Sequence, residues 1–145
     1  MYQKILVALE NSQADKSLLP HIVELAKLHK SKLLLVHVAD GWVARNYDKL
    51  QLRESQEMVD DRAYLDETAN QLRSNGLNVD TCLALGDPPN EILKTAEREQ
   101  CDLIAMTTHG HRLLADIFYG STIEHVRHRS MIPLLIVHAG TLNAG

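Results

Sequence analysis

Short apolar runs alternate with longer segments of helical periodicity, and this alternation limits the possible folds of the chain more than any other feature. Residues 5–9, 33–38 and 102–106 are almost continuously apolar, as expected of strands that are buried on both faces. Two further strands are predicted at residues 78–85 and 134–137. A helical segment separates each strand from the next, and this order is typical of a parallel sheet.

The segments between the strands carry the start and stop signals of helices. Helices are predicted over residues 15–30, 50–75, 88–100 and 121–129. Pro20 fits the first helix if its regular part begins near Ser17, or else requires a kink. Gly76 is a suitable C-cap for the second helix, and Asp87 a suitable N-cap for the third. The chain is therefore predicted to form one α/β domain over residues 1–145, with a five-stranded parallel sheet and helices on both faces.

Composition excludes several classes of protein. A chain of 145 residues has room for one domain, and its formal net charge of -4 gives no excess of cations for general nucleic-acid binding. The apolar runs are too short to span a bilayer, and the first strand begins at once, so neither a membrane partner nor a signal peptide is expected. Cys82 and Cys101 have no C-x-x-C spacing. These features predict a cytoplasmic protein.

A glycine motif follows the fourth predicted strand. It consists of residues 107–110 (TTHG), nine further residues, and residues 120–122 (GST) at the expected start of the last helix. Glycine allows close approach of a ligand, and a helix N-terminus offers free N–H groups and a positive dipole end to an anion. The motif indicates a phosphate cradle. The alternative is that Gly110 only forms a turn and Ser121 only caps a helix.

Other arrangements of reactive side chains have weaker support. His109, His111, His125 and His128 do not show the convergence of three or four ligands that zinc requires, so no metal site is predicted from them. Asp116 is a candidate for holding Mg²⁺ on bound phosphates, or else a solvated loop acid. The sequence has neither a G-x-S-x-G nor a G-x-x-x-x-G-K-[ST] motif. No catalytic residue is therefore predicted, and ATP hydrolysis is expected to be slow at most.

Several landmarks, taken in order, resemble those of the universal stress protein family. They are residues 4–8 (KILVA), residues 35–38 (LVHV), Gly86, the spacing from Gly110 to Gly120-Ser121, and residues 132–137 (IPLLIV). The resemblance covers nearly the whole chain. It implies a Rossmann-like fold of the adenine nucleotide alpha hydrolase type, ATP binding through a G-x-x-G-x9-G-[ST] motif, and homodimers that pair their last strands.

The resemblance also implies which residues would bind the nucleotide. Carried over residue by residue, it assigns Ala8, Leu9, Glu10, Val38, Met106, Thr107, Thr108, His109, Gly110, Gly120, Ser121 and Thr122. The first three would lie under the adenosine, and the backbone of Val38 would face the adenine edge. Residues 106–110 would wrap the ribose and phosphates, and the last three would donate to the phosphates. Two positions depart from the family pattern: Thr107 replaces the first motif glycine, and Glu10 replaces the usual aspartate.

Taken together, these features predict an adenine-nucleotide-binding stress-response module. ATP is the expected ligand, with ADP and AMP as alternatives and Mg²⁺ accompanying the phosphates. The homodimer is expected to form through residues 134–138. The competing hypothesis, favoured by the changes at Glu10 and Thr107, is a dimeric interaction module of the same fold that binds no nucleotide. A nucleotidyl-transfer enzyme would need a catalytic base, for which the sequence has no signature.

Overall fold

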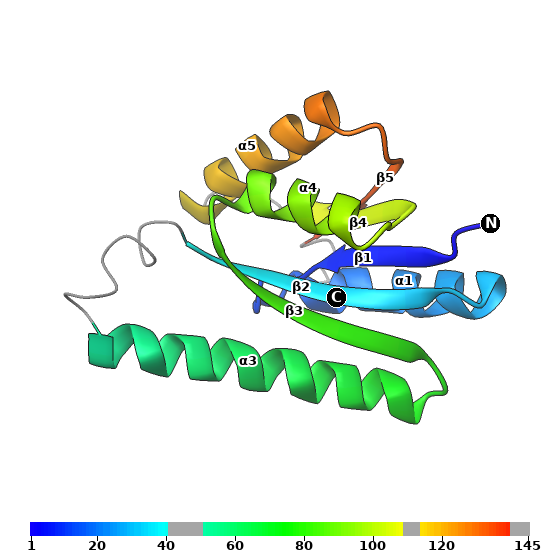
Figure 1. The fold of residues 1–145 in the computed structure, drawn as a ribbon, viewed down its shortest axis with the longest axis horizontal. Coiled ribbons are helices and arrows are strands. Elements are labelled where there is room, and N and C mark those ends of the chain that lie inside the picture. Colours follow the sequence, from blue (N-terminus) through cyan, green and yellow to red (C-terminus); the bar gives the residue numbers. More distant parts are fainter. Residues whose placement is uncertain (41–50, 109–113, 140–145) are drawn as a thin grey trace.

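The computed structural model describes residues 1–40, 51–108 and 114–139. Its elements, in chain order, are β1 (Lys4–Ala8), α1 (Asp15–His29), β2 (Lys32–Asp40), α3 (Gln51–Ser74), β3 (Asn78–Gly86), α4 (Pro88–Arg98), β4 (Leu103–Thr108), α5 (Leu114–Arg129) and β5 (Leu134–His138) (Figure 1). Strands and helices alternate as the sequence predicts. None of the helices within the described ranges is both long and apolar enough to cross a membrane.

The five strands form one parallel sheet in the order β3-β2-β1-β4-β5. This confirms the predicted fold class. At the centre of the sheet, Val7 of β1 pairs with Leu35 of β2 on one side and with Ala105 of β4 on the other. The chain winds outward from β1 to β3 and then crosses to the opposite side for β4 and β5. The winding direction thus reverses between β1 and β4, where open α/β sheets have a crevice at the carboxyl ends of their strands.

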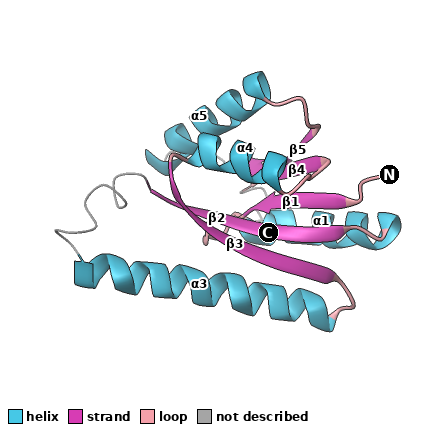
Figure 2. Ribbon diagram, viewed as in Figure 1, coloured by secondary structure: helices cyan, strands magenta, loops and turns pink. Residues whose placement is uncertain are grey.

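Helices cover both faces of the sheet, α1 and α3 on one and α4 and α5 on the other (Figure 2). Successive residues of β1 therefore enter different cores. Ile5 and Val7 pack with α1 and α3, whereas Leu6 packs with α4 and α5, and all three are 0% exposed. Burial on both faces explains why β1 is almost continuously apolar.

Three predicted helix boundaries are confirmed. The Asp87 side chain accepts a hydrogen bond from the Asn90 amide at 3.4 Å and caps α4, and Gly76 ends the turn after α3 with a φ of +88°. The predicted start of α1 at residue 15 is confirmed as well, because the helix begins at Asp15. Its first amides bond to carbonyls three residues earlier, which gives a tight first turn, and Pro20 lies inside the helix.

The predicted start of the last helix at Ser121 is wrong. The α5 helix begins at Leu114, and Gly120 and Ser121 lie in its interior. The spacer before Gly120 holds good helix formers such as Leu114 and Ala115 and no proline, so the helix continues through it. An interior amide bonds to the carbonyl four residues earlier. The expectation of a helix N-terminus at Gly120 is therefore corrected.

Candidate functional site

A pocket lies at the carboxyl ends of the central strands. It is lined by Ala8, Leu9, Glu10, Val36, Val38, Pro88, Ile92, Met106 and Thr107. Its empty volume is about 360 Å³, a figure that includes the open solvent at its mouth. The lining comes from both sides of the β1–β4 boundary. The pocket therefore occupies the place where sheets of this topology hold ligands.

The walls of the pocket are mainly apolar because of the pleat of β2 and the position of α4. Val36 and Val38 are two residues apart on β2 and so share the face that α4 covers. Ile92 of α4 packs in the same cluster and is 4% exposed. Beyond the end of β1, the Leu9 amide donates to the Val36 carbonyl at 2.8 Å and continues the pairing of the two strands. This pairing places Glu10 at the rim.

Two polar side chains meet across the boundary between β1 and β4. The Thr107 hydroxyl donates to Glu10 Oε2 at 3.0 Å, and Ser12 Oγ donates to Glu10 Oε1 at 3.2 Å. Thr107 is 2% exposed, whereas Glu10 is half-buried. Glu10 and Thr107 are the two positions where the sequence departs from the pattern that it resembles. The structure thus brings both departures into direct contact in the pocket.

A buried carboxylate fixes the turn that carries Glu10. Asp15 is 1% exposed and accepts hydrogen bonds from the amides of Glu10 and Asn11, each at 2.9 Å, and from the Tyr64 hydroxyl at 2.6 Å. Asn11 has a φ of 60°, so the chain turns sharply at this point. Burial raises the pKa of the Tyr64 phenol, and the bonded Asp15 carboxylate raises it further. The turn after β1 is therefore tied to both α1 and α3.

His37 provides a second connection between this turn and α3. Its Nδ1 lies 2.9 Å from the Leu9 carbonyl oxygen, and because a carbonyl only accepts, Nδ1 carries the hydrogen. Its Nε2 lies 3.3 Å from Asp61 Oδ2, and the other oxygen of Asp61 accepts a hydrogen bond from the Asn11 side chain at 2.9 Å. Both sides of the turn are thus anchored to the body of the domain.

Half of the predicted site residues line this pocket. They are Ala8, Leu9, Glu10, Val38, Met106 and Thr107. Thr108 lies elsewhere: its hydroxyl is 2.9 Å from Nδ1 of His138, which joins β4 to β5. Both Thr107 and Thr108 belong to β4 and not to the turn predicted after it.

The other predicted residues belong to the phosphate half of the expected site. Gly120 and Ser121 lie within α5, and Thr122 is 2% exposed in the same helix. His109 and Gly110 lie outside the described residues. The described part of the chain therefore defines the half of the site that was assigned to the adenosine.

Three lining residues are missing from the sequence prediction. Val36 could have been found from its spacing of two from Val38, which puts both on one face of β2. Pro88 and Ile92 follow the Gly86-Asp87 turn, which the sequence places at a carboxyl end without showing which strands lie beside it. Their contact with the pocket depends on the order of the strands, and no local pattern encodes that order.

The arrangement favours an apolar group that carries hydrogen-bond donors. Apolar walls suit a ring, and the Glu10 carboxylate accepts hydrogen bonds from hydroxyl or amino groups but cannot donate when ionised. Within the described ranges, no group of three or more His, Cys, Asp or Glu side chains is placed to hold a metal ion.

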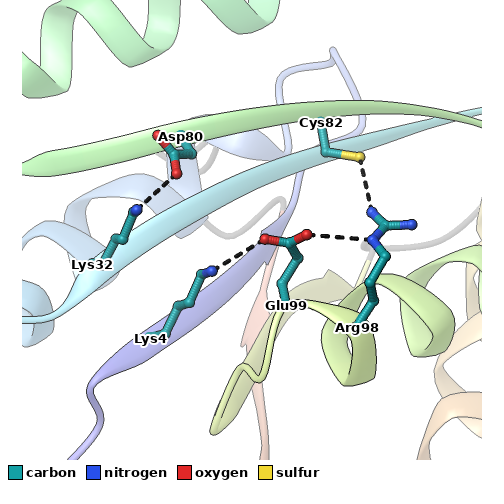
Figure 3. Close-up of polar contacts among 6 residues, drawn as sticks. All are labelled: Lys4, Lys32, Asp80, Cys82, Arg98 and Glu99. Atoms are coloured by element: carbon teal, nitrogen blue, oxygen red, sulfur yellow. Dashed lines mark hydrogen bonds and ion pairs between the residues drawn. The ribbon is translucent and has the colours of Figure 1, made fainter.

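Charged side chains at the opposite, amino end of the sheet are paired with one another (Figure 3). Lys4 Nζ lies 3.2 Å from Glu99 Oε1, Arg98 Nε lies 3.3 Å from Glu99 Oε2, and Lys32 Nζ lies 2.8 Å from Asp80 Oδ2. Lys4 and then Arg98 lower the pKa of Glu99, and the hydrogen bond from Lys32 lowers the pKa of Asp80. Three cations and two carboxylates therefore form this cluster, and each of them has an ion-pair partner within it.

Comparison with known proteins gives one consistent family. The family model described as the universal stress protein family matches residues 1–138. Universal stress protein MJ0577 of Methanocaldococcus jannaschii is 28% identical in an alignment that is 154 residues long with its gaps. The alignment covers 94% of this chain and 95% of the relative. The solved structure of MJ0577 has a TM-score of 0.81 at 27% identity and covers 97% of this chain and 99% of its own.

Two similar solved structures contain an adenine nucleotide. A universal stress protein in complex with cAMP has a TM-score of 0.69 at 21% identity, covering 96% of this chain and 98% of its own. One from Archaeoglobus fulgidus in complex with dAMP has a TM-score of 0.70 at 20% identity, covering 94% and 98%. At these identities the similarity establishes a shared fold.

Proposed function

Because this chain belongs to the universal stress protein family, we propose that it binds an adenine nucleotide between β1 and β4 and serves as a homodimeric, cytoplasmic stress-response module. The observation that carries the proposal is the pocket at the reversal of winding direction, with apolar walls and the Glu10 carboxylate at its rim. Relatives of the same fold in complex with cAMP and dAMP support adenine as the base.

The adenosine group would occupy the pocket that the described residues line. Val36, Val38 and Ile92 would pack against the base, and Glu10 would accept a hydrogen bond from the nucleoside. The phosphates would extend toward His109, Gly110, Gly120 and Ser121, the residues that the resemblance assigns to them. When the ligand is ATP or ADP, Mg²⁺ would bind to the phosphate oxygens, as this ion usually does.

Hydrolysis is proposed to be slow at most. The sequence contains neither a P-loop motif nor a nucleophile elbow. If the nucleotide is bound without rapid hydrolysis, the fraction of protein that carries it follows the nucleotide concentration. Such a response suits a regulatory protein. A phosphate-release assay with ATP and Mg²⁺ would measure this directly.

Isothermal titration calorimetry with AMP, ADP and ATP, each with and without Mg²⁺, tests nucleotide binding. Saturable heat at millimolar nucleotide or below supports the proposal, whereas the absence of both heat and a thermal shift contradicts it. Val38→Phe puts a larger side chain into the pocket and should abolish binding. Val59→Phe on α3 is the matched control, because Val59 is 60% exposed and does not line the pocket.

The proposed dimer rests on the outer strand of the sheet. In the described sheet β5 comes last in the strand order, and it pairs with β4. Its sequence, LLIVH, is mainly apolar, and Ile136 is 38% exposed. An apolar edge strand favours aggregation unless it is covered, and a second copy related by a two-fold axis would cover it. The proposed interface is therefore residues 134–138.

The second candidate function is a dimeric interaction module that binds no nucleotide. The contact between Thr107 and Glu10 favours it, since the carboxylate is already hydrogen-bonded in the protein alone. A protein that is dimeric by light scattering and gives no heat with any of the three nucleotides would support this function.

A further inference from the structure

We propose that Thr107 is a positioning residue of the ligand site, and that its hydroxyl holds the Glu10 carboxylate in the orientation that receives an N–H or O–H donor from the nucleoside. This inference rests on the proposed nucleotide binding. Two groups on the ligand offer the required chemistry, the sugar hydroxyls and the exocyclic amino group of adenine, and the experiment below distinguishes them.

The Glu10 carboxylate is restrained by hydrogen bonds to both of its oxygens. Thr107 fixes Oε2 at 3.0 Å, and Ser12 approaches Oε1 at 3.2 Å. The main chain of Glu10 is held as well, because its amide donates to the buried Asp15 at 2.9 Å. A carboxylate that is held at both ends and at its backbone loses little freedom when a ligand binds, and such preorganisation increases affinity.

The side chain of Thr107 has little conformational freedom. Threonine is β-branched, so its χ1 angle is restricted, and at 2% exposure its hydroxyl has little room to turn. A glycine at this position would offer no side-chain donor. Thr107 lies inside β4 and pairs with Val137 of β5, so the strand fixes its Cα position. The hydroxyl is therefore a fixed donor aimed at the rim of the pocket.

The restrained Glu10 carboxylate should select between ligands that carry a hydrogen-bond donor and ligands that lack one. An ionised carboxylate accepts hydrogen bonds and donates none, so the ligand group next to Glu10 has to be a donor. An analogue that lacks this donor leaves a restrained carboxylate facing an apolar edge, which is unfavourable. A mobile carboxylate could turn away and would discriminate less. The hydroxyl of Thr107 should therefore control how strongly the site rejects the analogue.

The experiment measures the affinities of three ligands: AMP, 2′,3′-dideoxy-AMP without sugar hydroxyls, and purine riboside monophosphate without the amino group. In the wild type, one analogue should bind about tenfold more weakly than AMP. Thr107→Val removes the hydroxyl at nearly constant shape and should reduce this ratio to about twofold or less. Thr107→Ser retains the hydroxyl and should keep the ratio. The analogue that is rejected identifies the donor.

Glu10→Gln provides a second route should Thr107→Val fail to fold, since Glu10 is only half-buried. The amide can donate as well as accept, so the ratio should fall in this variant too. The inference is wrong if the wild type binds AMP without rejecting either analogue. It is also wrong if the ratio persists in Thr107→Val or in Glu10→Gln, since a purely structural role would weaken all three ligands equally. A wild type that binds none of them overturns the proposed function and this inference with it.

Discussion

The Tyr64 hydroxyl donates a 2.6 Å hydrogen bond to the carboxylate of Asp15 and so joins α3 to the turn after β1. Asp15 is 1% exposed, so its carboxyl group relies on the surrounding protein donors for its hydrogen bonds. Tyr64→Phe should therefore lower the free energy of unfolding by about 1.5–3 kcal/mol, the usual range for a hydrogen bond to a charged group. Urea denaturation measures this change. Tyr2→Phe is the matched control, because the described contacts of Tyr2 are made by its ring, packed edge-to-face on His29, and by its carbonyl oxygen, which accepts from Ser31.

Stability at alkaline pH should depend on the same phenol. Burial and the Asp15 carboxylate raise the pKa of Tyr64, so the folded state retains its proton more strongly than the unfolded state. Its contribution is complete below the unfolded value of about 10 and is lost as the pH rises above that value. The urea midpoint of the wild type should fall more steeply above about pH 10 than that of Tyr64→Phe. Parallel curves for the two proteins would contradict the prediction.

Stability at acidic pH should depend on the ion pairs at the amino end of the sheet. The hydrogen bond from Lys32 lowers the pKa of Asp80, so this pair stabilises the folded state above the ordinary carboxyl pKa and is lost as the pH falls through the folded value. Asp80→Asn should flatten the acid limb of the stability curve. The effect should be small because the Asp80 side chain is 53% exposed. Asp66→Asn on the exposed surface of α3 should leave the acid limb unchanged.

The two cysteines should differ in reactivity. Burial raises the pKa of the Cys101 thiol to about 11, and the residue is 5% exposed, whereas Cys82 is half-buried on β3. The thiolate is the nucleophile, so iodoacetamide at about pH 8 should modify Cys82 first and Cys101 only after unfolding. Mass spectrometry of tryptic peptides measures both sites. Rapid labelling of Cys101 in folded Cys82→Ser would show that the buried thiol is accessible.

The proposed dimer can be tested at the edge strand. Ile136→Lys introduces a charge on the exposed side of β5, and two such charges facing each other across a two-fold axis should give monomers by light scattering. Val59→Lys, on the exposed surface of α3, is expected to remain dimeric. Dimers that persist in Ile136→Lys would place the interface elsewhere.

The strands and most helix boundaries could be predicted from the sequence because the signals for them are local. Ile5 and Leu6 enter different cores, and burial on both faces leaves a continuous apolar run in the sequence. The start of α5 was missed because Gly120-Ser121 has the composition of a helix start. The apolar residues before it form a helix as well, and their propensity prevails.

The lining residues that were assigned to the adenosine, such as Leu9 and Glu10, were identified through resemblance and not through spacing. Glu10 and Thr107 are 97 residues apart, and only the crossing from β3 to β4 makes β1 and β4 neighbours. Pro88 and Ile92 were missed for the same reason, since the strand order decides what α4 covers. Contacts of this kind arise from topology, which a single sequence encodes only weakly.

The separation of the ion-paired end from the pocket has a practical consequence. The strand β1 has five residues, and its ends at Lys4 and Ala8 are roughly 13 Å apart, at about 3.3 Å for each of the four steps between them. A chemical tether attached near Lys4 or Lys32 would leave the mouth of the pocket pointing away from a solid support. The protein could then be immobilised on a sensor surface with its pocket open to the solution.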